Sequence, residues 1–244
     1  MEDRDHSDSR IPQSRSCCSS SSFLLTRHPI GASLPTSIIM ITDRVLDVIK
    51  KTDVDLSYRI FKSVPKTART KTILKGLEWS CNGIIWLTLT MALMFSFPKN
   101  DALKYLMSGL IMDIVYVAVT KAYARRVRPS YAPQNDQFGV ISVDKHSFPS
   151  GHATRAIYVA FFASLYAPSV VSFVIWCWSF AVSISRVLLG RHHVADVAAG
   201  FVIGSLHYLI QFVIGFPVYP LLYWIMTSFV GDFSSKNDLE SVLD

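Results

Sequence analysis

The sequence predicts an all-α fold, namely a polytopic membrane bundle of about six transmembrane helices. Half of the 244 residues are hydrophobic, and from Trp79 onward they gather into long uncharged stretches. Each stretch is close to the ~20 residues that a helix needs to cross the core of a bilayer. We expect helices because lipid cannot satisfy the backbone donors and acceptors of an open sheet.

The predicted spans are separated by tight turns on one side of the membrane. They cover residues 79–97, 102–120, 153–166, 169–189, 194–216 and 218–230. The third and sixth are short for a full crossing, so they either use flanking residues or lie where the bilayer thins. With turns after the first and third spans, the connector 121–152 and the turn 190–193 lie together on the other face.

The segments outside the spans differ in composition. We divide the chain into a tail, a membrane-surface segment, a transmembrane domain and a second tail, which cover residues 1–37, 38–78, 79–231 and 232–244. The first tail is polar and rich in serine, which predicts disorder. In the surface segment, Ile41, Val45, Val48 and Ile49 share one helical face, which is typical of an amphipathic helix.

The orientation follows from the basic residues near the span ends. Most of them lie on the face that carries the connector 121–152. Lys and Arg concentrate in cytosolic loops, so we expect this face and both termini to be cytosolic. Within the spans, we expect Cys81 and Cys177 to pack, and Asp113 and His207 to make buried hydrogen bonds.

The first motif, KAYARRVRP, runs from Lys121 to Pro129 at the end of the second span. Lys121 and Arg128 are two helical turns apart, so they point the same way if the helix continues beyond the membrane. Pro129 disfavours helix at Arg128 and turns the chain. The two cations can clamp a phosphate, but a role as topology markers alone remains an open alternative.

The second motif, PSGH, opens the third span. Ser150 is a natural N-cap, Gly151 permits a close approach to the backbone, and His152 lies in the first turn. Such a helix start binds anions, and His152 can donate a proton to the group that the anion carries. A solvated surface histidine is the alternative.

The third motif places Arg186 at the end of the fourth span and His192 four residues before Asp196. At this spacing Asp196 can reach one imidazole nitrogen of His192 and leave the other as a nucleophile. A helix cap is the competing role for Asp196. His193 has no carboxylate four residues later, because position 197 is valine, so we expect it to play a supporting role.

Together the three motifs indicate phosphoryl transfer without a metal. A transferring phosphoryl group needs its equatorial charge offset, and Lys121, Arg128 and Arg186 can provide this. We therefore expect no metal site and no cofactor, and an activity independent of Mg²⁺. The same cations should lower the pKa of both motif histidines.

The motifs resemble the signature Lys-x6-Arg-Pro, Pro-Ser-Gly-His and Ser-Arg-x5-His-x3-Asp of the type 2 phosphatidic acid phosphatase superfamily. That family also includes bacterial acid phosphatases and vanadium haloperoxidases. The segments SFPSGHATRA and SRVLLGRHHVADVAAG resemble those of the polyisoprenoid diphosphate phosphatases, a branch of this superfamily that includes presqualene diphosphate phosphatase.

The resemblance implies a role for each motif residue. It implies phosphate binding by Lys121, Arg128, Ser150, Gly151 and Arg186. His192 would attack phosphorus and form a phosphohistidine, Asp196 would orient it, and His152 would protonate the leaving oxygen.

The function expected from the resemblance is that of an integral-membrane lipid phosphate phosphatase acting on isoprenoid mono- and diphosphates such as presqualene, farnesyl and geranylgeranyl diphosphate. Endoplasmic reticulum and nuclear envelope suit these substrates. We expect the membrane and a lipid phosphate as partners, and no nucleic acid, while the oligomeric state stays open. The alternatives are phosphatases of phosphatidate, lysophosphatidate or sphingosine phosphate, a lipid phosphotransferase, a haloperoxidase and a non-catalytic membrane scaffold.

Overall fold

The regular secondary structure of the described part of the chain is α-helical, apart from one isolated bridge between Val127 and His146. The computed structural model describes residues 36–65, 67–131 and 146–213, with Trp224 and Ser228. Contacts divide the chain into Met1–Thr42 and Asp43–Asp244, and the second part holds the bundle discussed below. Seven α-helices and no β-strand occur among the described residues, so the predicted all-α fold is confirmed.

Helix α1, Thr36–Ser63, covers the predicted amphipathic segment and extends it toward the bundle. Val45, Val48 and Ile49 are each more than half exposed. Farther along, Ser57 and Phe61 are buried, and they lie one turn apart on the same side of the helix. From Asp43 onward, α1 thus packs along a narrow stripe and leaves an apolar face uncovered, as an amphipathic helix at a membrane surface would.

Helices α2, Ala68–Ser80, and α3, Gly83–Ser96, meet at a bend of 49°. Asn82 causes the break because its side-chain oxygen caps α3, accepting a hydrogen bond from the amide of Ile84 at 2.9 Å. The predicted span over residues 79–97 is therefore interrupted near its start, and α3 follows only residues 83–96 of it. The bend places Glu78, on the last turn of α2, beside the motif residues.

Helix α4, Asp101–Ala124, is capped by Asn100 and ends at Arg125, which has a left-handed φ of 46°. The helix therefore stops one turn after Lys121 and does not reach Arg128. The condition under which Lys121 and Arg128 would share one helix face is therefore not met, because the left-handed residue turns the chain away before Pro129.

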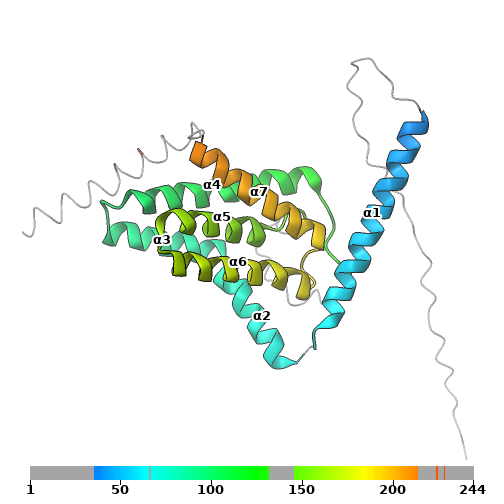
Figure 1. The fold of residues 1–244 in the computed structure, drawn as a ribbon, viewed down its shortest axis with the longest axis horizontal. Helices are drawn as coiled ribbons and strands as arrows, with labels where there is room; N and C mark the ends of the chain where they lie inside the picture. The colour runs from blue at the N-terminus through cyan, green and yellow to red at the C-terminus, as the bar shows by residue number, and fades with distance from the viewer. Residues whose placement is uncertain (1–35, 66, 132–145, 214–223, 225–227, 229–244) are drawn as a thin grey trace, which may run out of the picture. The chain divides into compact units, whose positions relative to one another are not determined.

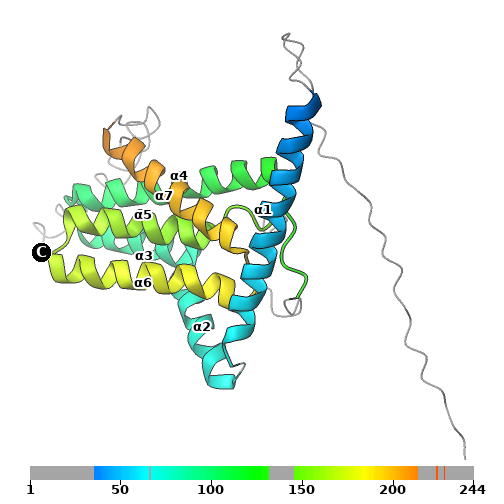
Figure 2. The same cartoon turned by 45° about the vertical axis from the view of Figure 1, so that its right-hand side comes forward.

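Helix α5, Gly151–Tyr166, packs against α4, α6 (Ser169–Leu188) and α7 (Val194–Val213) in both views of the bundle (Figures 1 and 2). Two glycines permit the close approach of α7 to α5. A Cβ at Gly204 would lie 2.5 Å from the carbonyl oxygen of Thr154, and one at Gly200 would lie 2.8 Å from that of Ser150. The starts of α5 and α7 are thereby brought into contact.

Three helices, α4, α6 and α7, are long and apolar enough to cross a membrane, and the bent pair α2–α3 makes a fourth if it is counted as one span. Helix α5 follows the predicted third span but is only 16 residues long. The predicted sixth span and both predicted tails fall almost wholly outside the described residues. The chain is therefore a helical membrane protein, with its six-span topology still a prediction.

Sequence reasoning identified only one partner of the buried ion pair between α4 and α5. Asp113 of α4 lies 3.0 Å from the guanidinium of Arg155 on α5, which also donates to the carbonyl of Cys81 at 3.1 Å. His207 stacks on Tyr158 with ring centroids 4.6 Å apart. Asp113 thus makes the expected buried polar contact and Cys81 packs as expected, whereas His207 contacts aromatic rings and Cys177 is exposed.

Candidate active site

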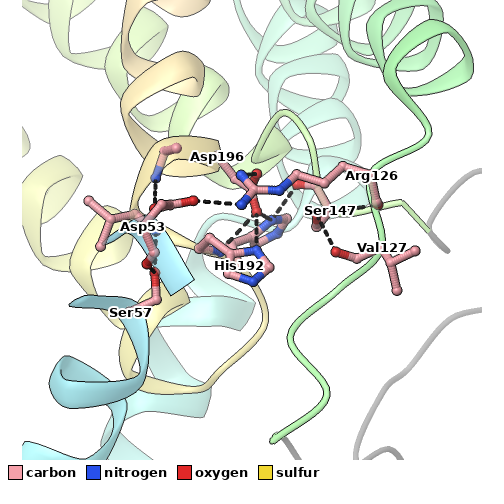
Figure 3. A network of polar contacts seen from close by, with 10 residues as sticks. Asp53, Ser57, Arg126, Val127, Ser147, His192 and Asp196 are labelled. Atoms are coloured by element: carbon pink, nitrogen blue, oxygen red, sulfur yellow. Dashed lines mark hydrogen bonds and ion pairs between the residues drawn. The ribbon is translucent and has the colours of Figure 1, made fainter. Parts of the chain in front are cut away.

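Residues of the first and third motifs, Arg126, His192 and Asp196, lie together with Ser147 (Figure 3). The amide of Ser147, just before the second motif, donates to the carbonyl of Arg126 in the first motif at 2.8 Å. The amide of Ser150 donates to the carbonyl of Asp196 in the third motif at 3.1 Å. Segments far apart in sequence are therefore joined by backbone hydrogen bonds, and the predicted convergence is confirmed.

His192 has a defined tautomer. Its Nδ1 lies 2.6 Å from the backbone carbonyl oxygen of Ser147. A carbonyl oxygen only accepts hydrogen bonds, so Nδ1 carries the proton and donates it. Nε2 of the neutral ring then keeps its lone pair, which is the form that a nucleophilic histidine needs.

The surroundings of His192 keep the ring neutral. Burial lowers the pKa of His192 well below its usual range, and the positive charges of Arg186, Arg128 and Lys121 lower it further. The hydrogen bond to Ser147 opposes this only in part. The three predicted cations therefore all act on His192, although α4 ends at Ala124 and so does not carry Arg128.

Asp196 is fully buried, and it contacts the backbone of the loop before α7 more closely than it contacts the ring of His192. Its Oδ2 accepts from the amide of His193 at 2.8 Å, the N3-to-N-cap contact of a capping box. Its Oδ1 accepts from Arg126 at 2.7 Å, whereas Nδ1 of His192 lies 3.9 Å from Oδ2. The expected orienting hydrogen bond from His192 thus goes to Ser147, and the competing cap role of Asp196 is realised.

His193 contacts Asp196 even though no carboxylate stands four residues after it. Its Nδ1 lies 3.3 Å from Oδ2 of Asp196, at a separation of three residues. Both three- and four-residue spacings place side chains on one helix face. The sequence prediction for His193 considered only position 197, four residues later, and therefore missed this pair.

The start of α5 offers hydrogen-bond donors to an anion. Ser150 occupies the N-cap position, but its side chain does not cap the helix. Its hydroxyl is buried and has no hydrogen-bond partner among the described residues. Together with the orphan amides of the first helical turn, this hydroxyl is suited to a phosphate oxygen. A Cβ on Gly151 would come within 3.2 Å of Val117, so the glycine also lets α5 pack on α4.

Arg186 is buried and paired with a carboxylate that sequence reasoning did not identify. Its Nη1 lies 2.7 Å from Oε1 of Glu78, and Nε of Arg191 lies 3.6 Å from the same oxygen. The backbone of Glu78 is also hydrogen-bonded to the ring of His152. The charges of Arg186 and Lys121 act on His152 as they do on His192. Both predicted catalytic histidines therefore share one cationic site.

A pocket of about 230 Å³ adjoins this site, between the end of α1, the helix α2 and the end of α6. Arg191 lines it together with Lys71 and Lys75, and the other walls include Phe61 and Leu188. The lining of the pocket thus combines basic and apolar side chains. Such a surface suits an amphiphilic anion.

Two further residues bind Asp196 or its helix, and motif spacing did not reveal them. Sequence reasoning counted Arg126 only among the basic residues near the span ends, yet it donates to Asp196 and, at 2.6 Å, to Asp53. Asp53 also accepts from the amide of Ala195, 142 residues away in the chain. No local sequence signal connects α1 with α7, so only the tertiary structure identifies this network.

Comparisons with known proteins agree with this geometry. The sequence profile of the PAP2 superfamily matches residues 102–219, a range that includes all three motifs. A protein described as "Probable lipid phosphate phosphatase beta" from Arabidopsis thaliana is 34% identical over 159 residues, or 54% of this chain and 74% of that protein. Phosphatidylglycerophosphatase B of Bacillus subtilis is 34% identical over 114 residues, or 40% of this chain and 53% of that protein.

The fold is similar to that of a solved membrane enzyme. The crystal structure of a PAP2 type phosphatidylglycerolphosphate phosphatase from Bacillus subtilis matches with a TM-score of 0.56 at 26% identity, over 67% of this chain and 84% of that one. The family profile, the relative from Arabidopsis thaliana and the solved structure all indicate the same family. The motif residues that define this family lie together in the structure. This chain belongs to the PAP2 superfamily.

Proposed function

We propose that this protein is an integral-membrane lipid phosphate phosphatase that acts through a phosphohistidine at His192. The observation that carries the proposal is the hydrogen bond from Nδ1 of His192 to the carbonyl of Ser147. It leaves Nε2 as a nucleophile inside a cluster of buried cations, which is the arrangement that attack on a phosphate requires.

In the first step, Nε2 of His192 attacks phosphorus and forms the P–N bond as the bond to the leaving oxygen breaks. His152 transfers its proton to that oxygen. The charge on the equatorial oxygens is offset by Lys121, Arg128 and Arg186. The carboxylate of Asp196, 3.9 Å from Nδ1 of His192, stabilises the positive charge that the ring acquires.

In the second step, a water molecule attacks phosphorus from the side that the leaving group vacated. His152 accepts a proton from that water, the P–N bond breaks, and phosphate leaves. His192 returns to its neutral form. Because three fixed cations perform the charge neutralisation, we propose that the reaction needs no divalent metal.

For the substrate we favour isoprenoid diphosphates. Arg191 extends the cationic cluster beyond the motif cations, and it lines the adjoining pocket together with Lys71 and Lys75. A diphosphate carries more negative charge than a monoester, so extra cations beside the cleavage site favour it. The apolar walls suit the first units of an isoprenoid chain.

Phosphatidate, lysophosphatidate and sphingosine phosphate form the second candidate class. The observation in their favour is the similarity to phosphatases of glycerolipids, since the Bacillus subtilis protein is named a phosphatidylglycerophosphatase. Their monoester would use the same cations and the same histidines. The two classes differ in what they require of Arg191, which makes them separable by experiment.

We further propose that the active face is cytosolic and that the protein resides in the endoplasmic reticulum or nuclear envelope. The support is the concentration of Lys and Arg on the face that carries the motifs. Protease protection of tags on either terminus in sealed microsomes would test this orientation.

The test of the function is phosphate release from farnesyl diphosphate, farnesyl monophosphate and phosphatidate in detergent micelles with EDTA. Wild type, His192→Ala and Arg191→Gln are compared. We expect release from farnesyl diphosphate, loss with His192→Ala, and a reduced preference for the diphosphate with Arg191→Gln. Preference for phosphatidate would exclude the isoprenoid assignment, and turnover by His192→Ala would exclude the phosphohistidine mechanism.

A further inference from the structure

Asp53 on α1 uses both of its carboxylate oxygens on the segments that carry the site (Figure 3). Oδ2 accepts from Nη2 of Arg126 at 2.6 Å, and Oδ1 accepts from the amide of Ala195 at 2.9 Å. The side chain of Asp53 is only 9% exposed. This carboxylate therefore has a defined position between the first motif and the start of α7.

Arg126 bridges two carboxylates with its two terminal nitrogens. Nη2 contacts Asp53 and Nη1 contacts Oδ1 of Asp196 at 2.7 Å. The side chain of Asp196 has no exposed surface, so its charge depends on nearby partners. The guanidinium of Arg126 is planar and rigid. Because Asp53 holds one of its terminal nitrogens, the other nitrogen approaches Asp196 from a fixed direction.

The start of α7 is capped by α1 as well as by its own chain. A helix start leaves its first amide groups without intrahelical partners. Here Asp196 accepts from the amide of His193, and Ser57 accepts from that of Val194 at 2.9 Å. Asp53 accepts from that of Ala195. Three consecutive amides are thus satisfied, two of them by residues of α1.

These contacts act on the segment that carries His192. The loop before α7 is held at its other end by Arg186, whose carbonyl accepts from the amides of Arg191 and His192 at 3.0 and 3.3 Å. A shift of the α7 start would move His192 relative to the cations on α4 and α6. In-line attack tolerates little displacement of this kind.

We propose that Asp53 is a positioning residue for phosphoryl transfer. Through Arg126 and the amide of Ala195 it holds Asp196 and the start of α7, and so keeps His192 in line with the bound phosphate. This inference rests on the proposed role of His192 as nucleophile. It assigns α1, which lies outside the family profile match at residues 102–219, a part in the reaction.

Three variants separate the contacts of α1. Asp53→Asn keeps an oxygen that can accept from Ala195 but removes the charge that faces Arg126. Ser57→Ala removes only the acceptor for Val194. Asp55→Asn makes the same charge change at an exposed position of the same helix, so it is the matched control.

We expect Asp53→Asn to lower kcat about tenfold, the loss typical of one hydrogen bond to a charged group, with KM changed less than about twofold. Asp55→Asn should leave both parameters unchanged. In an Arg126→Gln background, Asp53→Asn should have little further effect, because the contact through which it acts is already gone. A purely structural role would instead lower the folded fraction by the same factor in both backgrounds.

Amide hydrogen exchange of α7 provides a readout that does not depend on activity. Asp53→Ala and Ser57→Ala should each speed exchange in a peptide that covers residues 193–197, whereas Asp55→Asn should not. The inference is overturned if Asp53→Asn matches Asp55→Asn in kcat, or if its effect persists in full beside Arg126→Gln. Activity that survives His192→Ala would instead refute the proposed function, whatever the α1 variants do.

Discussion

Nδ1 of His192 and the backbone carbonyl of Ser147 lie 2.6 Å apart, although the residues are 45 positions apart in the chain. Because the partner is a main-chain oxygen, no substitution of the Ser147 side chain removes it. The carbonyl is held in place by the hydrogen bonds of Ser147 to the first motif, from its amide to Arg126 at 2.8 Å and from its hydroxyl to Val127 at 3.1 Å. The tautomer of the nucleophile thus depends on how two loops pair.

Replacing His192 should abolish turnover, whereas replacing its neighbour should not. His192→Ala removes Nε2, while His193→Ala keeps the amide that binds Asp196 and loses only a ring contact of 3.3 Å. We expect no detectable turnover for His192→Ala and at least about a tenth of the wild-type kcat for His193→Ala. Trapping of an acid-labile phosphoenzyme from labelled substrate checks this. A phosphoenzyme in His192→Ala but not in His193→Ala would reverse the assignment.

The acid limb of kcat/KM should move to higher pH when a cation is removed. The charge of Arg128 helps to lower the pKa of His192, and the ring must be neutral to attack. Arg128→Gln therefore raises this pKa toward its usual value, so protonation inactivates the free enzyme at a higher pH.

Arg125→Gln is the matched control for that experiment, because Arg125 is exposed and contacts only the end of its own helix among the contacts described for it. Its pH profile should match that of wild type. An Arg128→Gln profile whose acid limb stays in place, or moves to lower pH, would contradict the electrostatic account of His192.

Removing the charge of Glu78 should strengthen binding of phosphate. Its carboxylate is paired with Arg186 and Arg191, so a substrate anion that binds Arg186 must compete with it. We expect Glu78→Gln to lower the inhibition constant for inorganic phosphate about tenfold. Inhibition titrations check this, with Asp47→Asn at an exposed position of α1 as a control. Weaker inhibition would show that Glu78 orients Arg186 for the phosphate instead.

The ion pair between Asp113 and Arg155 should matter for stability. Removing one partner leaves an uncompensated buried charge, so we expect Asp113→Asn to cost about 3 kcal/mol of unfolding free energy. Asp101→Asn, at an ion pair whose carboxylate is 70% exposed, should cost less than about 1 kcal/mol. Thermal unfolding in detergent compares the two. The combination of Asp113→Asn with Arg155→Met should recover part of the loss, and a result worse than Asp113→Asn alone would contradict this account.

The sequence by itself was sufficient for the fold class and the motif residues. Long apolar stretches predict membrane helices because the bilayer leaves few other ways to satisfy a backbone, and α4, α6 and α7 follow the predicted spans closely. Motif residues could be identified because phosphoryl transfer needs cations, a nucleophile and a proton donor, and few residue types supply them. The sharp turn at Gly190, whose φ is 69°, also follows from local chemistry.

Only the tertiary structure decided which atoms meet. The helix break at Asn82 brings Glu78 to Arg186, and the early end of α4 replaces a continuous helix with a loop that carries Arg126 to Asp196. The partners of His192 and of the α7 start come from Ser147, Asp53 and Ser57. The periodicity of residues in the sequence indicates which side chains share a face of one helix, because that face recurs every three or four residues. It carries no information on contacts between segments that the packing of helices brings together.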